Sequence, residues 1–176
     1  MYNWQKYEYK VVRTNEKEST PIFVATPDLA ADLFSDHAKE LDHESFWVIP
    51  LDAQNGALGV QEVYRGTVGG MAVRAAEVLR SAILSNALSI VVVHNHPSGS
   101  LKASENDLKM TKDLVRAARL LDIELLDHLV VNGKNEWLSI RSGDPELWHM
   151  EIPEWKRDTN ALSADPVLES VVASAA

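Results

Sequence analysis

A short run of β-branched residues near the middle of the chain restricts its fold more than any other feature. Residues 88–93 read Leu-Ser-Ile-Val-Val-Val, which is typical of a strand buried on both faces of a sheet. The run stops at residues 94–99, His-Asn-His-Pro-Ser-Gly, where proline and glycine cannot continue a strand. We therefore expect polar side chains to lie where a buried strand ends.

The patterns on either side of this run predict a mixed β-sheet flanked by helices, in the α/β class. Apolar residues recur every three to four positions in three segments, which predicts helices over residues 28–41, 73–87 and 104–121. Strands are predicted over residues 46–51, 57–64, 88–93 and 122–131, the first two as a hairpin. Asn132-Gly133 predicts a second hairpin, into residues 136–140.

The length of 176 residues suits one main domain with its own core. We expect an extended or hairpin-forming segment over residues 1–27, a domain over residues 28–142 and a tail over residues 143–176. The end of this tail is rich in Ala and Ser, but Trp148, Trp155 and the Val171/Val172 pair could dock on the domain.

Composition excludes several classes of function. The chain has no cysteine, so any bound metal must be held by histidines and carboxylates. The formal net charge of −9 disfavours a broad nucleic-acid interface, although a local basic patch is not excluded. No apolar run approaches the roughly 20 residues of a membrane span, and the N-terminus lacks a signal-peptide pattern. We therefore expect a cytoplasmic protein without membrane contact.

The polar residues after the central strand have the spacing of a metal site. Alternate residues of an extended chain point to the same side, so His94 and His96 can offer nitrogens to one ion. Asp107, one turn into the next helix, can add an oxygen, which leaves the fourth position of a tetrahedral zinc ion open. Read individually, these residues have simpler explanations, because Ser104 to Asp107 also fits an ordinary helix N-terminus and residues 95–99 an ordinary tight loop.

The string HNHPSGSLKASEND resembles the JAMM signature of the JAB/MPN metallohydrolase family, in which His-x-His-Pro is followed by Ser-x-x-Asp. HNHPSG, the downstream LDHLVV and Glu77-Val78-Leu79 resemble its RadC-like branch. The resemblance covers roughly residues 28–142. It implies a cytidine-deaminase-like α/β fold, a Zn2+ cofactor and hydrolysis of peptide or isopeptide bonds.

The resemblance also implies roles for individual residues. It makes His94, His96 and Asp107 the zinc ligands and Ser104 the hydroxyl that stabilises the oxyanion. The family's catalytic glutamate precedes a buried strand, and Glu44 matches that place. Among the other upstream glutamates, Glu77 is the second choice, whereas Glu40 and Glu62 are expected to be solvated.

Several neighbouring residues have two readings. His128, on a predicted buried strand, is expected to be a core histidine rather than a ligand, and Asp127 either orients a ligand histidine or makes an ordinary turn contact. Asn95 and Ser98 are expected to fix the loop rather than to contact substrate. Ala76 and Ala103 stand where many RadC-like sequences have Arg and Pro, but neither position is a ligand.

Three functions are therefore expected, in decreasing order of preference. The first is a zinc-dependent hydrolase that acts on a peptide or protein substrate. The second is a RadC-like accessory protein associated with DNA repair, in which the metal is structural or acts on another bond. The acidic balance disfavours it, and residues 1–27 leave no room for the helix–hairpin–helix module of fuller relatives. The third, a catalytically idle scaffold, is disfavoured by the complete residue set. The sequence does not indicate the oligomeric state.

Overall fold

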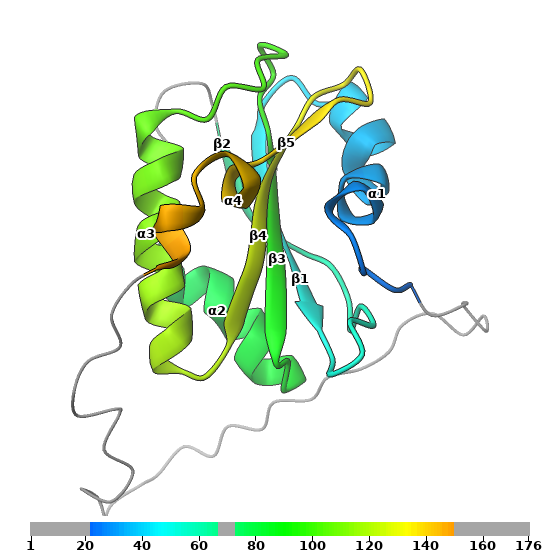
Figure 1. Cartoon of the computed structure of the whole chain (residues 1–176). Coiled ribbons are helices and arrows are strands. Elements are labelled where there is room, and N and C mark those ends of the chain that lie inside the picture. Colours follow the sequence, from blue (N-terminus) through cyan, green and yellow to red (C-terminus); the bar gives the residue numbers. More distant parts are fainter. Residues whose placement is uncertain (1–21, 67–72, 150–176) are drawn as a thin grey trace, which may run out of the picture.

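A five-stranded sheet in the order β2-β1-β3-β4-β5 lies at the centre of the computed structural model, which describes residues 22–66 and 73–149 (Figure 1). Its strands are β1 (Glu44–Leu51), β2 (Gln61–Gly66), β3 (Ser89–Asn95), β4 (Glu124–Val131) and β5 (Trp137–Ser139). Only β3 and β4 pair in parallel; the other neighbours are antiparallel. The sheet is therefore mixed, as predicted.

Helices cover both faces of this sheet. The structure contains helices α1 (Pro27–Lys39), α2 (Ala75–Ser85), α3 (Glu105–Leu120) and the short α4 (Ile140–Gly143), followed by a 3-10 turn, η1 (Pro145–Trp148). Helix α1 packs on one face, whereas α2 and α3 pack on the other (Figure 1). This arrangement confirms the predicted α/β class. None of these helices is long and apolar enough to span a membrane.

The alternation of side chains along the central strands decides which residues face α3. In β3, Val91 and Val93 pack in the core beneath α1, whereas Ile90 and Val92 pack in the core beneath α2 and α3. His94 has the same parity as Ile90 and Val92, so its ring lies on the α3 side. The same alternation in β4 places the ring of His128 on that side, next to the ring of His94.

Two parts of the chain differ from the sequence predictions. The second strand occupies residues 61–66 instead of 57–64, because a turn stabilised by the Asp52 carboxylate delays the pairing and leaves only an isolated bridge at Ala57. Helix α4 and η1 were not predicted, and Trp148 at the end of η1 is buried, with its Nε1 donating to the Leu125 carbonyl at 2.7 Å. Of the predicted N-terminal segment, residues 1–21 lie outside the described residues, as do Trp155 and Val171/Val172, whereas Phe23 forms an isolated bridge with Gly56.

Candidate metal centre

A sharp turn brings the end of β3 next to the beginning of α3. The backbone N–H of Gly99 donates to the His96 carbonyl at 2.9 Å, and Gly99 has a φ of 75°, which favours glycine over other residues. The chain then enters α3, which packs along the neighbouring strand β4 (Figure 1). As a result, Asp107 in the first turn of α3 faces His94 and His96.

The predicted ligand atoms lie close together. Nε2 of His94 lies 3.0 Å from Nε2 of His96, and the Asp107 carboxylate oxygens lie 3.4 Å from the His94 nitrogen and 3.5 Å from the His96 nitrogen. A tetrahedral ion with bonds of about 2.0–2.1 Å requires ligand atoms about 3.3–3.4 Å apart. The three side chains therefore form a group that could hold a metal ion.

Both imidazoles have their other nitrogen engaged away from this group. Nδ1 of His96 donates to the Ser100 carbonyl at 2.8 Å, since a carbonyl only accepts. Nδ1 of His94 lies 2.8 Å from Nε2 of His128. The two Nε2 atoms consequently face each other and Asp107. Such a set of nitrogen and carboxylate donors needs a proton or a metal cation between its members, and it suits zinc and other first-row divalent metals.

The pKa values of Asp107 and His96 in the metal-free protein reflect this need for a proton or a cation. Burial by itself raises the pKa of Asp107, but the neighbouring imidazoles of His94 and His96 outweigh it and hold the pKa of this carboxyl far below its usual range. The hydrogen bond with Asp107 raises the pKa of His96, against the effect of burial. A carboxylate that stays ionised next to two imidazoles strongly favours a cation.

Ser104 is the N-cap of α3 and holds Asp107 in place. The Ser104 hydroxyl accepts from the backbone N–H of Asp107 at 3.2 Å, while the Ser104 N–H donates to Oδ2 of Asp107 at 2.7 Å. Neither of these two bonds uses the proton of the Ser104 hydroxyl. Ser104 is exposed and lies beside the candidate ligand group. Ser104 is thus an ordinary N-cap, and its hydroxyl is also a hydrogen-bond donor beside the candidate metal site.

Glu44 begins β1 at the same end of the sheet. Since Phe46 pairs with His94 in an antiparallel register, continuing the register places Glu44 opposite His96, and the charge of Glu44 contributes to the raised pKa of His96. The buried side chain of Asn95 holds the main chain on both sides of Glu44. Its Oδ1 accepts from the Ser45 N–H at 2.7 Å and its Nδ2 donates to the His43 carbonyl at 2.9 Å.

The other upstream glutamates lie in different settings. Glu77 belongs to the first turn of α2 and accepts from the Arg74 N–H at 3.3 Å. Glu62, on β2, accepts from the Ser45 hydroxyl at 2.7 Å and pairs with Arg65. Glu40 is exposed at the end of α1. Among the four glutamates, register places Glu44 opposite a candidate ligand.

Two residues of the LDHLVV segment agree with one of their predicted readings: His128 is a buried histidine outside the candidate ligand group, and Asp127 makes turn contacts. The Asp127 carboxylate accepts from the Ser139 hydroxyl at 2.6 Å and from the backbone N–H groups of His128 and Arg141, so it ties β4 to the start of α4. Burial raises its pKa, and these bonds oppose that rise. The ring of His128, not the carboxylate of Asp127, contacts the candidate ligand His94. The only sequence signal was the position of His128 on a buried strand.

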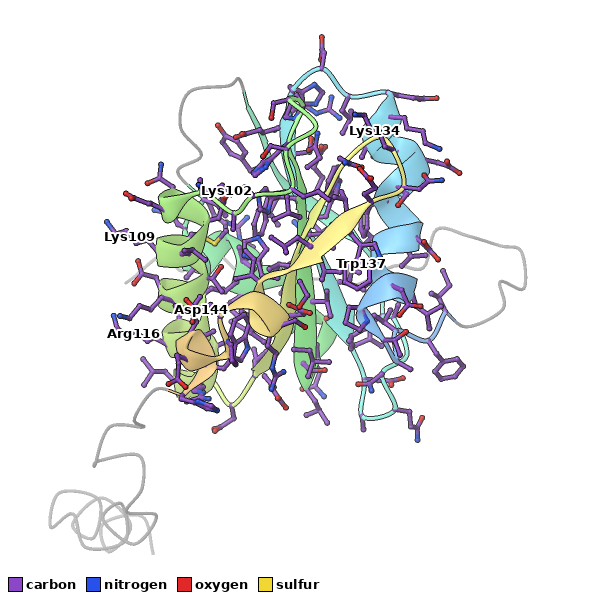
Figure 2. The ribbon with its side chains drawn as sticks, turned by 45° about the horizontal axis from the view of Figure 1, so that its top comes forward. Lys102, Lys109, Arg116, Lys134, Trp137 and Asp144 are labelled. Atoms are coloured by element: carbon purple, nitrogen blue, oxygen red, sulfur yellow. The ribbon has the colours of Figure 1, made fainter. Side chains whose placement is uncertain are left out.

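The outer surface of α3 and the loop before it carry exposed cations. Lys109 and Arg116 extend outward from α3, and Lys102 lies in the preceding loop (Figure 2). Acidic residues interrupt this row, because Oδ1 of Asp113 lies 3.8 Å from Arg116. The surface is therefore mixed in charge, unlike the clustered Lys and Arg of a phosphate-binding stripe.

Comparison with known proteins places this geometry in context. The model of the RadC-like JAB domain matches residues 24–145. Similar proteins include three named UPF0758 protein, from Roseiflexus castenholzii, Chloroflexus aggregans and Staphylococcus carnosus. They are 42%, 36% and 37% identical over 67%, 75% and 70% of this chain.

The same alignments cover 50%, 56% and 54% of the three relatives. The chain thus spans about half the length of the curated relatives it matches. The matched part contains β1, β3 and α3, the elements that carry the candidate metal centre.

Proposed function

Because the chain belongs to the RadC-like JAB domain family, we propose that it is a zinc-dependent hydrolase of peptide or isopeptide bonds. One observation carries this proposal. Two imidazole Nε2 atoms lie 3.0 Å apart beside an ionised carboxylate, and each ring has its Nδ1 engaged elsewhere. His94, His96 and Asp107 would hold the metal. When bound, zinc supplies a Lewis acid that lets a water molecule react near neutral pH.

The protein's own groups would then move protons and stabilise charge. Glu44 accepts a proton from the attacking water and delivers it to the leaving nitrogen as the C–N bond breaks, so that a carboxylic acid and an amine are released. The Ser104 hydroxyl donates to the oxygen on which negative charge develops. Asn95 keeps Glu44 in reach by holding the residues on either side of it.

Metal analysis combined with two matched variants tests this function. Purified wild-type protein is expected to bind one equivalent of zinc and to cleave members of a panel of peptides and isopeptide-linked substrates until a chelator is added. Glu44→Gln should keep zinc but lose at least 10²-fold in turnover, as expected for loss of a general base. Glu77→Gln is the control, since Glu77 caps α2, and it should keep both zinc and turnover.

Different outcomes would contradict different parts of the proposal. Wild-type protein without affinity for zinc would overturn the metal site. Loss of zinc in Glu44→Gln would make Glu44 a ligand instead of a base. Salt-sensitive binding of single-stranded or branched DNA by a zinc-loaded chain that cleaves no amide would favour the DNA-repair accessory function.

A further inference from the structure

A chain of buried hydrogen bonds leads from His94 back to Asp107. Nδ1 of His94 lies 2.8 Å from Nε2 of His128, and Nδ1 of His128 lies 2.6 Å from Oγ1 of Thr111. Oγ1 of Thr111 in turn donates to the backbone carbonyl of Asp107 at 2.6 Å. His128 and Thr111 are completely buried, so these bonds are shielded from exchange with water.

The chemistry of each group fixes the direction of every bond. The Asp107 carbonyl can only accept, so it takes the single hydroxyl proton of Thr111. Oγ1 of Thr111 must then accept from an N–H at Nδ1 of His128. A neutral imidazole carries one N–H, which makes Nε2 of His128 an acceptor and Nδ1 of His94 a donor. Nε2 of His94 is left with its lone pair directed at His96 and Asp107.

We propose that His128 and Thr111 are positioning residues that hold His94 in the Nδ1–H tautomer, so that its Nε2 is free to bind the metal. The inference rests on the metal site proposed above. Metal-binding histidines commonly donate their second nitrogen to a carboxylate or a carbonyl. Here the acceptor is a neutral imidazole, which orients the ligand without adding negative charge to the site.

The same bonds join ligands from different parts of the fold. His94 belongs to β3, His128 to β4, and Thr111 and Asp107 to α3. Phe46 packs against the rings of His94 and His128, with ring centroids 6.1 Å and 5.5 Å away, and closes the network from β1. The Thr111 hydroxyl therefore influences a ligand that it does not touch.

The tautomers can be measured directly in the metal-free wild-type protein. Long-range 1H–15N NMR spectra distinguish a protonated Nδ1 from a protonated Nε2 in each histidine. We expect a protonated Nδ1 and an unprotonated Nε2 for both His94 and His128. A wild-type spectrum with His94 protonated at Nε2 alone would overturn the proposal, and this result needs no variant and no activity.

Thr111→Val and Thr111→Ser form a matched pair for the metal. Valine has nearly the shape of threonine but no hydroxyl, so it removes the acceptor that orients His128, whereas serine keeps it. Thr111→Val is expected to populate the Nε2–H tautomer of His94. It should also weaken zinc binding about 10–100-fold in chelator competition, which is the usual effect of losing a hydrogen-bond partner of a metal ligand. Thr111→Ser should stay within a few-fold of wild type.

A merely structural role for Thr111 predicts something else. Thr111→Val and Thr111→Ser would then both shift the thermal unfolding temperature, but neither would change the zinc affinity or the His94 tautomer from those of the wild type. That result would overturn the proposal. His128→Gln gives a second check, because its amide can accept from His94 and donate to Thr111, and it should bind zinc better than His128→Leu. Zinc binding that follows this pattern without any amide cleavage would support the inference while contradicting the proposed function.

Discussion

Ser104 combines a structural and a chemical task in one hydroxyl group. Its oxygen caps α3 by accepting from the Asp107 N–H, while its main-chain N–H holds the Asp107 carboxylate toward the two histidines. The sequence is consistent with either task, since Ser-x-x-Asp is common at helix N-termini. The structure adds that the capped carboxylate lies 3.4 Å and 3.5 Å from two imidazole nitrogens.

Substitution of Ser104 should therefore affect stability and turnover by different amounts. Ser104→Ala is expected to cost about 1 kcal/mol of unfolding free energy through the lost cap. It should lower turnover on a cleaved substrate roughly 10²- to 10³-fold through the lost oxyanion donor, with zinc still bound. Ser104→Thr, which keeps the hydroxyl, is the control. Turnover of Ser104→Ala near the wild-type value would remove Ser104 from the chemistry.

At the level of secondary structure, the site depends on how β1 and β3 end together. The backbone ladder between these strands stops at the Phe46–His94 pair, and beyond it the side chain of Asn95 replaces the backbone as partner of His43 and Ser45. The residue between the two candidate ligands thus anchors the residues around Glu44. Alternation turns the Asn95 side chain away from those of His94 and His96, and its amide reaches the main chain of His43 and Ser45.

Asn95 and Asn132 allow this anchoring to be tested with similar substitutions. Both are buried asparagines that bind main-chain groups, but Asn132 holds the β4–β5 turn and its Nδ2 donates to the Gly99 carbonyl at 3.3 Å. Replacing either with Ala is expected to cost about 1–3 kcal/mol, because buried main-chain groups lose their partners. Asn95→Ala should lower turnover at least tenfold more than Asn132→Ala, because Asn95 holds the residues on either side of Glu44. An equal fall of turnover in both variants would contradict a specific link to Glu44.

Across the whole molecule, stability and metal binding are coupled through protons. In the metal-free protein the raised pKa of His96, caused mainly by its hydrogen bond with Asp107, means that the folded state binds this proton more tightly than the unfolded state. The resulting stability is complete below the unfolded value of about 6.5 and is lost as the pH rises through the folded-state pKa. The lowered pKa of Asp107 contributes stability that is lost only in strong acid.

The metal-free and zinc-loaded proteins should consequently respond to pH in opposite directions. Between pH 8 and pH 6 the proton that His96 gains stabilises the metal-free protein, while the lowered pKa of His128, caused mainly by burial, offsets part of this gain. The zinc-loaded protein should become less stable, because protons compete with zinc for the ligand nitrogens. Thermal unfolding with a chelator and with excess zinc at several pH values measures both trends. Parallel trends in the two series would contradict a shared site for protons and metal.

The sequence alone indicated most of the helices and strands and the candidate ligand group, because both depend on local repeats. Alternation along residues 88–96 places His94 and His96 on one side, a Pro-Gly turn follows, and helical spacing places Asp107 one turn after Ser104. Such patterns act over a few residues, so they can be read without knowing the sheet order. The turn that delays β2 and the docking of Trp148 depended on contacts that these repeats do not specify.

Only the tertiary structure decided which groups support the ligands. His128 meets His94 across 34 residues of sequence, Thr111 meets His128 across 17, and Asn95 meets Ser45 across 50. These contacts exist because β3 pairs with both β1 and β4 in a particular register and α3 packs over that face. Register and strand order arise from packing of the whole core. For this reason the sequence favoured Glu44 only through the family resemblance. For the same reason it predicted His128 as a core histidine without indicating its contact with His94.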